Sequence, residues 1–238
     1  MPFLLPFNLY RNRYYLYHMI IINSHTLLPL LAAHLPQNAI IVEAGAFIGK
    51  DTKRLSLLFP QGAIHAFEPV PEIYAQLCRQ TQEYSNIKRY PYALSNKRET
   101  AIFHVAQHPH RPDKVCQAGS LLAPQERLTR SPIYYPITIN VPTLTLDQWA
   151  HETNTKKVDF LWLDLQGHEL AVLQASPSIL STVSLIYLEV NFIQAYKDQP
   201  SKRVIDSWLA SQGFYPLAQD FQNETDWFYG NVLYKSIK

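Results

Sequence analysis

A buried strand followed by two glycines constrains the fold of this chain more than any other stretch. The run AIIVEA (39–44) is typical of a buried strand, and KDTKRLSLLF (50–59) places Leu55, Leu58 and Phe59 on one face of a helix. Gly45 and Gly49 lie between them, where the chain has to turn tightly. This strand–turn–helix unit is typical of open α/β sheets that bind a nucleotide-like ligand above the turn.

Strand-like and helix-like stretches alternate along the rest of the chain. Further strands are expected at 63–68, 87–94, 100–106, 134–142, 158–165 and 183–190. Helices are expected at 72–84 after Pro71, at 145–153 with Thr145 as N-cap, and at 168–176 and 202–212. Residues 107–131 indicate a long loop, and prolines indicate that 134–142 is an edge strand. The sequence therefore predicts an α/β fold, a doubly wound and mostly parallel sheet, with an antiparallel closing strand pair at 214–218 and 228–235.

The first 36 residues differ in composition from the rest. They are apolar and rich in tyrosine, and Arg11 and Arg13 interrupt them, so a membrane-spanning helix is not expected. No convincing cleavage site follows, so a secretion signal is not expected either. We predict a helical N-terminal extension (1–36) packed on one domain (37–238). The alternative, a substrate entrance or a contact with a membrane surface, rests on four tyrosines: Tyr10, Tyr14, Tyr15 and Tyr17.

Charge and cysteine content exclude some classes of protein. The chain of 238 residues has 47% hydrophobic residues, which predicts a packed globular core. Its net charge is +2 and no block of Lys or Arg stands out, so no nucleic-acid partner is predicted. Cys78 and Cys116 lie far apart in the sequence and are expected to be free thiols in a reducing compartment, which favours a cytoplasmic location.

Two classes of nucleotide fit the glycine turn poorly. A P-loop needs G-x-x-x-x-G-K-[ST], whereas Gly45, Gly49, Lys50 and Asp51 make a loop one residue shorter, with a carboxylate in place of the magnesium-binding hydroxyl. A dinucleotide turn needs G-x-G-x-x-G. Phe47 occupies the second glycine position, where the backbone has to approach a pyrophosphate, and Lys50 occupies the third.

S-adenosylmethionine fits the turn better, because it carries no phosphate. Glu43 precedes the turn, and Glu68 ends the next predicted strand about 20 residues beyond Gly45, which is the usual spacing of a ribose-binding acid. A carboxylate there accepts charge-assisted hydrogen bonds from both ribose hydroxyls. The sequence therefore favours S-adenosylmethionine over the two nucleotides.

A set of motifs in a fixed order carries a family resemblance. The motifs are VEAGAFIGKDT (42–52), AFEPVPEIYAQL (66–77), YALSN (92–96), VPTLTLDQW (141–149), VDFLWLDLQGHELAVL (158–173), LIYLEV (185–190), QGF (212–214) and GNVLY (230–234). Over roughly residues 39–235 the chain resembles the FkbM family of S-adenosylmethionine-dependent methyltransferases. The resemblance implies a Rossmann-like class I methyltransferase fold and methyl transfer to hydroxyl oxygens of sugars, polyketides or other small molecules.

The chain also departs from the usual family pattern at four positions. Glu43 stands where Asp is common, Phe47 where Asn is common, Trp162 where Lys is common and His168 where a small residue is common. Glu43 keeps the negative charge, so the cofactor is still expected. Trp162 and His168 predict an acceptor pocket of a different shape and polarity.

The resemblance implies a set of cofactor-binding residues. Gly45 and Gly49 are expected over the methionine part, Glu68 at the ribose, and the residues after the third strand at the adenine. Two alternatives stay open: Glu43 merely orients the loop, and Leu94 belongs to the core. The full set is Glu43, Gly45, Ala46, Phe47, Gly49, Thr52, Glu68, Pro69, Ala93, Leu94, Ser95 and Asp164.

Three residues are candidates for catalysis: Asp164, His168 and Glu189. A hydroxyl acceptor has to lose a proton during methyl transfer, and a carboxylate or a neutral imidazole can take it. Alternatively, Asp164 anchors the next helix, His168 is a solvated residue at a helix start, and Glu189 contacts an acceptor or a metal. A divalent metal is left open but not predicted, because His104, His108 and His110 match no zinc pattern. Glu169 is expected to cap its helix or to pair locally, and Ser120 lies in a loop expected to cover the acceptor.

These observations favour O-methylation of a hydroxyl on a sugar, a glycan or a small metabolite. N-methylation of an amine, which needs no strong base, is one alternative. A cofactor-binding protein that acts as a partner without catalysis is the other. The sequence does not indicate the oligomeric state.

Overall fold

The computed structural model describes residues 19–23 and 25–237 of the protein. The tyrosines predicted to line an entrance or to touch a membrane (Tyr10, Tyr14, Tyr15 and Tyr17) lie outside the described residues, so both ideas stay predictions. Within the described part, none of the helices combines the length and the apolar character needed to cross a bilayer.

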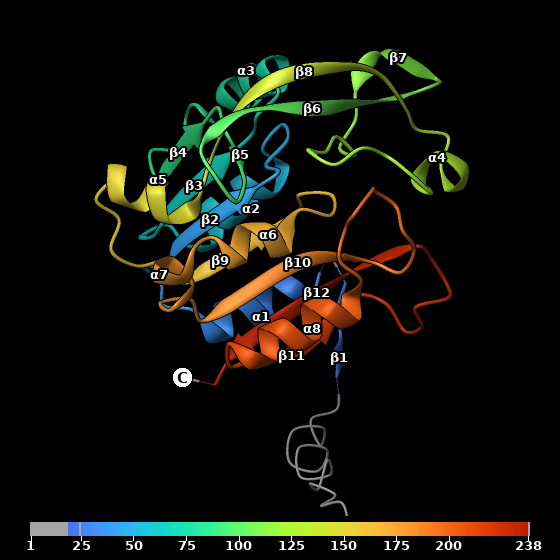
Figure 1. Cartoon of the computed structure of the whole chain (residues 1–238). Coiled ribbons are helices and arrows are strands. Elements are labelled where there is room, and N and C mark those ends of the chain that lie inside the picture. Colours follow the sequence, from blue (N-terminus) through green and yellow to red (C-terminus); the bar gives the residue numbers. More distant parts are fainter. Residues whose placement is uncertain (1–18, 24, 238) are drawn as a thin grey trace, which may run out of the picture.

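A mixed sheet forms the centre of the molecule (Figure 1). In the described part of the chain it has eight strands in the order β1-β11-β12-β10-β9-β2-β3-β4. Five neighbouring strands run parallel: β10 (Leu185–Asn191), β9 (Phe160–Leu163), β2 (Ile40–Ala44), β3 (Ala63–Phe67) and β4 (Ile87–Tyr90). The chain order reverses between β2 and β9, and such a switch point is where open α/β sheets bind ligands.

The closing strands are antiparallel, as predicted. β12 (Tyr229–Ser236) runs antiparallel to β10 on one side and to β11 (Phe214–Gln219) on the other. β1 (Ile20–Ile21) adds a short parallel strand beside β11. The predicted doubly wound and mostly parallel sheet with an antiparallel closing pair is therefore confirmed.

Helices cover both faces of the sheet because the buried strands are apolar on both sides. In β2, for example, Ile41 packs toward one core cluster and Val42 toward the other. The first face carries α1 (Leu27–His34), α2 (Lys50–Leu58) and α3 (Pro71–Thr81). The second face carries α5 (Leu146–Glu152), α6 (Glu169–Gln174), α7 (Pro177–Leu180) and α8 (Lys202–Ser211).

A second sheet lies beyond the carboxyl ends of the central strands (Figure 1). Its strands, in the order β5-β8-β6-β7, are β5 (Ala93–Leu94), β8 (Tyr134–Leu144), β6 (Glu99–His108) and β7 (Arg111–Val115). Residues 134–142 of β8 pair with β6 on one side only. On the other side of β8, β5 pairs with Thr143 and Leu144 alone. This part of β8 is therefore an edge, as its prolines predicted.

Two predicted boundaries are wrong in this region. Residues 87–94 form two strands, β4 and β5, because Pro91 lacks the N–H that would continue the ladder of the central sheet. Residues 107–131 are not one loop, because β6 continues to His108 and the segment contains β7 and α4 (Arg127–Arg130). Hydrogen bonds to the preceding strand β6, across a short turn, stabilise β7, a stretch whose composition alone indicates a loop.

The described part of the N-terminal extension packs on the central sheet. Helix α1 confirms the helical prediction for residues 27–34, whereas residues 20–21 are a strand. Ile22, Leu27 and Leu31 are buried in the same core cluster as Ala218 and Leu233 of the closing strands. The division of the chain at residue 36 stays a prediction.

Candidate functional site

The turn between β2 and α2 requires glycine at both predicted positions. Gly45 has a φ of +83°, and a Cβ there would lie 2.1 Å from the carbonyl oxygen of Asp164. Gly49 has a φ of +84°, and its Cβ would lie 2.7 Å from side-chain carbons of Leu77 and Thr81. Phe47 between them also has a positive φ, of 50°, although it is not glycine. The backbone therefore passes tightly over the ends of β2 and β9.

Glu68, at the end of β3, is tied to this turn. Its Oε2 accepts a hydrogen bond from the backbone N–H of Phe47 at 3.1 Å, and its Oε1 accepts one from Val70 at 2.9 Å. Burial raises the pKa of Glu68 to about 7, and the two hydrogen bonds oppose that rise. Each carboxylate oxygen has two lone pairs, so Glu68 keeps acceptor capacity for ribose hydroxyls.

A pocket opens above the turn, and the second sheet forms its roof. Its empty space, including the open mouth, is about 640 Å³. Six residues of β6, β7 and the loop after β7 line it from above: Phe103, Val115, Cys116, Gln117, Gly119 and Leu121. The loop of Ser120 thus covers the pocket as expected, and the Ser120 hydroxyl fastens it by donating to the backbone oxygen of Gln166 at 2.9 Å.

The pocket brings together only part of the predicted site. Its lining includes Gly45, Phe47, Glu68, Pro69, Ala93, Leu94, Asp164 and His168. The lining does not include Glu43, Ala46, Gly49, Thr52, Ser95 or Glu189. Trp162 is also absent from it and packs edge-on against Tyr187 on the face of α1–α3, so its effect on an acceptor pocket stays a prediction.

Glu43 lies behind the turn, on the side of α2. The side chain is 3% exposed, and burial raises its pKa to about 8. The Thr52 hydroxyl beside it opposes that rise, but Glu43 Oε2 and Thr52 Oγ1 complete no hydrogen bond of normal geometry within the described residues. Neither residue lines the pocket, so Glu43 and Thr52 support the turn from behind.

Asp164 and Glu189 are joined by a glutamine that sequence reasoning missed. Gln166 donates from its Nε2 to Asp164 Oδ1 at 2.6 Å and to Glu189 Oε2 at 3.1 Å, and its Oε1 accepts from the Tyr196 hydroxyl at 2.6 Å. Burial raises the pKa of both acids. Glu189 also accepts from Asn191 Nδ2 at 3.3 Å. Glu189 therefore stands behind Asp164, and only Asp164 reaches the pocket.

Arg127 of α4 is a second residue that the sequence did not reveal. The side chain is 7% exposed, and its guanidinium lies over the rings of Tyr196, Phe228 and Tyr229. Its Nε and Nη1 have no hydrogen-bond partner within the described residues. The positive charge lowers the pKa of Asp164 and Glu189 against the effect of burial. The sequence did not indicate that Arg127 is buried near these acids, because it lies in a segment predicted to be a loop.

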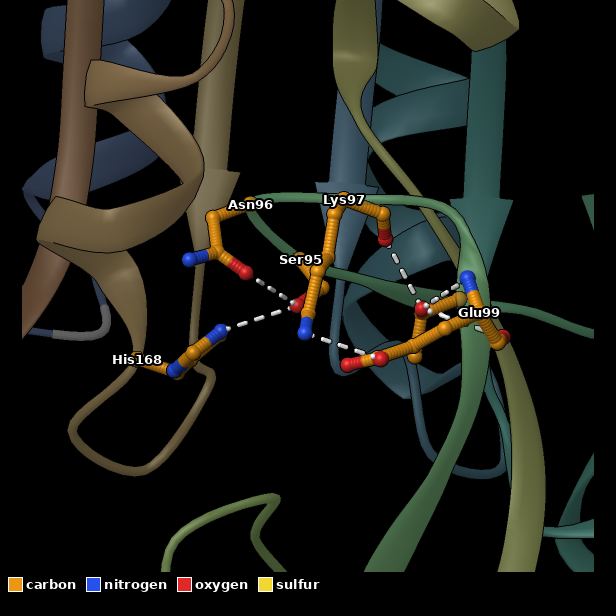
Figure 2. Close-up of polar contacts among 6 residues, drawn as sticks. Ser95, Asn96, Lys97, Glu99 and His168 are labelled. Atoms are coloured by element: carbon orange, nitrogen blue, oxygen red, sulfur yellow. Dashed lines mark hydrogen bonds and ion pairs between the residues drawn. The ribbon is translucent and has the colours of Figure 1, made fainter.

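His168 lines the pocket at the start of α6. Figure 2 shows its Nε2 facing Ser95 Oγ, and the two atoms are 3.1 Å apart. Burial lowers the pKa of His168, so the imidazole is neutral near pH 7. Glu169 accepts from the backbone N–H groups of Leu165 and Gly167, at 2.8 and 3.3 Å, so its side chain pairs locally with the loop before α6.

The three catalytic candidates do not form a metal site. Among residues 19–23 and 25–237, no three His, Cys, Asp or Glu side chains are grouped to hold an ion.

Cys78 and Cys116 are free thiols, as predicted.

The residues of the pocket fit S-adenosylmethionine. Glu68 keeps acceptor capacity at the end of β3, and the apolar residues Ala93 and Leu94 line the same pocket. The strand order, the glycine turn and the acid at the end of β3 define the class of doubly wound methyltransferases that use this cofactor.

Comparison with known proteins identifies the family within that class. The family described as Methyltransferase FkbM domain matches residues 43–216, so the chain belongs to the FkbM methyltransferases. It is 25% identical over 200 residues to the 2-O-methyltransferase NoeI of Sinorhizobium fredii (strain NBRC 101917 / NGR234), covering 84% of this chain and 80% of that protein. The protein is therefore an S-adenosylmethionine-dependent methyltransferase.

Solved structures show the same fold at low identity. An rRNA methylase from Streptococcus thermophilus superposes with a TM-score of 0.53 and 12% identity, over 93% of this chain and 100% of that one. The magnesium protoporphyrin IX methyltransferase of Synechocystis PCC 6803 was solved with bound S-adenosylmethionine. It superposes with a TM-score of 0.50 and 11% identity, over 89% of this chain and 77% of that one. The fold is thus shared by methyltransferases that act on very different molecules.

Proposed function

We propose that the protein transfers a methyl group from S-adenosylmethionine to a hydroxyl oxygen of a sugar-like acceptor. The observation that carries this proposal is His168, a histidine kept neutral by burial and placed in the wall of the cofactor pocket. Methylation of a hydroxyl requires a group that takes its proton, and a neutral imidazole does so near pH 7. The similarity to a 2-O-methyltransferase supports the same chemistry.

The residues of the pocket divide the work. Glu68 is proposed to hold the ribose hydroxyls, Ala93 and Leu94 to contact the adenine, and the turn of Gly45 to hold the methionine part. When bound, the cofactor supplies a methyl group already activated by the sulfonium, so the protein has mainly to align the reacting atoms. His168 takes the acceptor proton, and Asp164 orients the acceptor hydroxyl.

An open groove adjoins the pocket and favours a polar acceptor. It shares five lining residues with the pocket: Phe47, Ile73, Val115, Cys116 and Gln117. Its other lining residues include Lys50, Glu72, Gln76, His108 and His110. These side chains offer donors and acceptors to the hydroxyls of a sugar or a small hydroxylated metabolite. The free thiols, Cys78 and Cys116, support a reducing location such as the cytoplasm.

Calorimetric titration with S-adenosylhomocysteine tests the cofactor half of this proposal. We expect micromolar binding, about −8 kcal/mol, and no binding of ATP or NAD. Glu68→Ala should weaken binding at least tenfold, whereas Glu83→Ala, an exposed acid after α3, should not change it. Equal binding by both variants would refute the role of Glu68.

Methyl transfer from a radiolabelled donor to a panel of sugars, glycosides and amines tests the other half. We expect transfer to hydroxylated acceptors, and a loss of at least about 100-fold in His168→Gln with unchanged affinity for S-adenosylhomocysteine. Transfer to amines alone, or full activity of His168→Gln, would overturn the proposal. Binding without transfer to any acceptor would favour a non-catalytic partner protein.

A further inference from the structure

The two ring nitrogens of His168 have different surroundings. Nε2 lies 3.1 Å from Ser95 Oγ, and no hydrogen bond to Nδ1 occurs within the described residues. A neutral imidazole carries one proton, so one of its nitrogens donates and the other accepts. Which nitrogen can take a proton from an acceptor therefore depends on what the Ser95 hydroxyl does.

The Ser95 hydroxyl has a second partner besides His168, the side-chain oxygen of Asn96 (Figure 2). Ser95 Oγ donates to Asn96 Oδ1 at 3.3 Å, and a serine hydroxyl has only one proton to give. When the hydroxyl proton goes to Asn96, the contact with His168 forms with Nε2–H as the donor and Ser95 Oγ as the acceptor. Nδ1 is left with a free lone pair.

The backbone around Ser95 is held by the second sheet. Ser95 is 3% exposed, and its N–H donates to the carbonyl oxygen of Leu144 at 2.9 Å. The buried Thr143 hydroxyl donates to the carbonyl oxygen of Lys97 at 2.8 Å and accepts from the N–H of Glu99 at 3.1 Å. The segment from Ser95 to Glu99 is thus fastened to β8, so the Ser95 hydroxyl meets His168 from a fixed position.

We propose that Ser95 is a positioning residue that holds His168 as the Nε2–H tautomer, which makes Nδ1 the atom that accepts the proton of the acceptor hydroxyl. This inference rests on the function proposed above. In the reaction, the acceptor oxygen forms a bond to the methyl carbon, the bond between that carbon and the sulfonium sulfur breaks, and the hydroxyl proton moves to Nδ1. The resulting imidazolium is stabilised because the hydrogen bond from Nε2–H to Ser95 becomes charge-assisted.

Nuclear magnetic resonance of the full chain with ¹⁵N-labelled histidine reads the tautomer directly. His168→Gln identifies the His168 signals in long-range ¹H–¹⁵N spectra of the protein bound to S-adenosylhomocysteine. We expect the Nε2–H pattern in the wild type and in Ser95→Thr, and a mixture of tautomers in Ser95→Ala. An Nδ1–H pattern in the wild type overturns the inference, and so does an unchanged Nε2–H pattern in Ser95→Ala.

Kinetics separate positioning from folding. Ser95→Ala should lower kcat at least about tenfold with little change in KM for the methyl donor, and Ser95→Thr should restore most of it. Ser56→Ala is the matched control, because Ser56 is a buried serine that donates to Asn86 at 2.5 Å, away from the pocket. Equal losses in Ser56→Ala and Ser95→Ala, or no rescue by threonine, would overturn the inference.

The two proposals fail in different ways. The tautomer is read without any methyl acceptor, so an Nδ1–H pattern in a protein that methylates hydroxyls refutes the role of Ser95 and leaves the proposed function intact. An enzyme that methylates only amines refutes the proposed function, whatever the tautomer of His168.

Discussion

Replacing Glu43 by glutamine should stabilise the protein at pH 8 relative to the wild type and should reduce the dependence of its stability on pH. Glu43 is buried in β2, and its Oε2 has no hydrogen-bond partner of normal geometry within the described residues. Burial raises its pKa most, the Thr52 hydroxyl opposes that rise, and the charges of Asp51 and Asp164 add to it. Together these raise its pKa from the usual 4.5 to about 8. Glutamine has the same shape and carries no charge at any of these pH values.

The sign follows from counting protons. Between pH 4.5 and 8 the folded protein keeps the Glu43 proton, which the unfolded chain has lost. Stability from this group is therefore fully present below pH 4.5, falls as the pH rises, and is lost once the pH passes 8. A difference of one bound proton between the folded and the unfolded protein changes the free energy of unfolding by about 1.4 kcal/mol per pH unit. Because the folded state itself begins to ionise near pH 8, the loss between pH 6 and pH 8 is about 2 kcal/mol.

Urea unfolding at pH 6, 7 and 8, followed by tryptophan fluorescence, measures this loss. The difference in stability between Glu43→Gln and the wild type should increase by about 2 kcal/mol from pH 6 to pH 8. Burial also raises the pKa of Glu68 and Glu169 to about 7, but both proteins contain them, so their contribution cancels. Glu83→Gln, at an exposed acid, should follow the wild type at every pH.

Parallel stability curves for Glu43→Gln and the wild type would refute this reasoning. They would mean that Glu43 is ionised in the folded protein at pH 6, held by a group that compensates its charge. The role of Glu43 beneath the turn would then need another explanation, because an ionised Glu43 would have a partner that this structure does not show.

Three further substitutions test the packing of the site. Gly45→Ala should lower the free energy of unfolding by more than about 3 kcal/mol in thermal denaturation, because alanine disfavours a φ of +83° and its Cβ would lie 2.1 Å from the Asp164 oxygen. Gln166→Leu should cost about 2–4 kcal/mol and reduce methyl transfer while leaving the affinity for S-adenosylhomocysteine unchanged, because it leaves buried carboxylates without their donor. Asp159→Ala should cost about 1–3 kcal/mol in urea unfolding without changing that affinity, because Asp159 accepts from the Ile40 N–H at 2.8 Å, at the opposite end of the strands from the pocket.

The central sheet was predictable because its signals are local. Apolar runs of strand length, such as residues 39–44 and 183–190, are buried on both faces and read as strands without knowledge of their neighbours. The N-cap of α5 was equally visible as Thr145, and the structure adds a capping box in which Thr145 and Gln148 exchange hydrogen bonds. The order of the strands is a long-range property, and only the family resemblance implied it.

The second sheet was harder to predict because its pairing is between distant segments. β6 and β8 pair in a register that joins Glu99 to Thr143 and Gln107 to Tyr134, across a segment of mixed composition. β7 contains a proline and lies in a stretch rich in histidine, which indicates a loop when read locally. The second sheet covers the pocket from above. The sequence therefore predicted the glycine turn and the strand ends below the pocket better than the strands that cover it.

The motif DLQGHE shows why the candidate catalytic residues could be named but not arranged. Gln166 and Gly167 both have positive φ values, of 53° and 98°, so the chain reverses direction within the motif. That reversal aims Asp164 and His168 into the pocket, while Gln166 and Glu169 point into the interior and hold the loop. A buried glutamine with a left-handed backbone is strained, and its hydrogen bonds to two carboxylates and a tyrosine offset that strain. The motif therefore works as one unit, in which the two residues that reach the pocket depend on the two that do not.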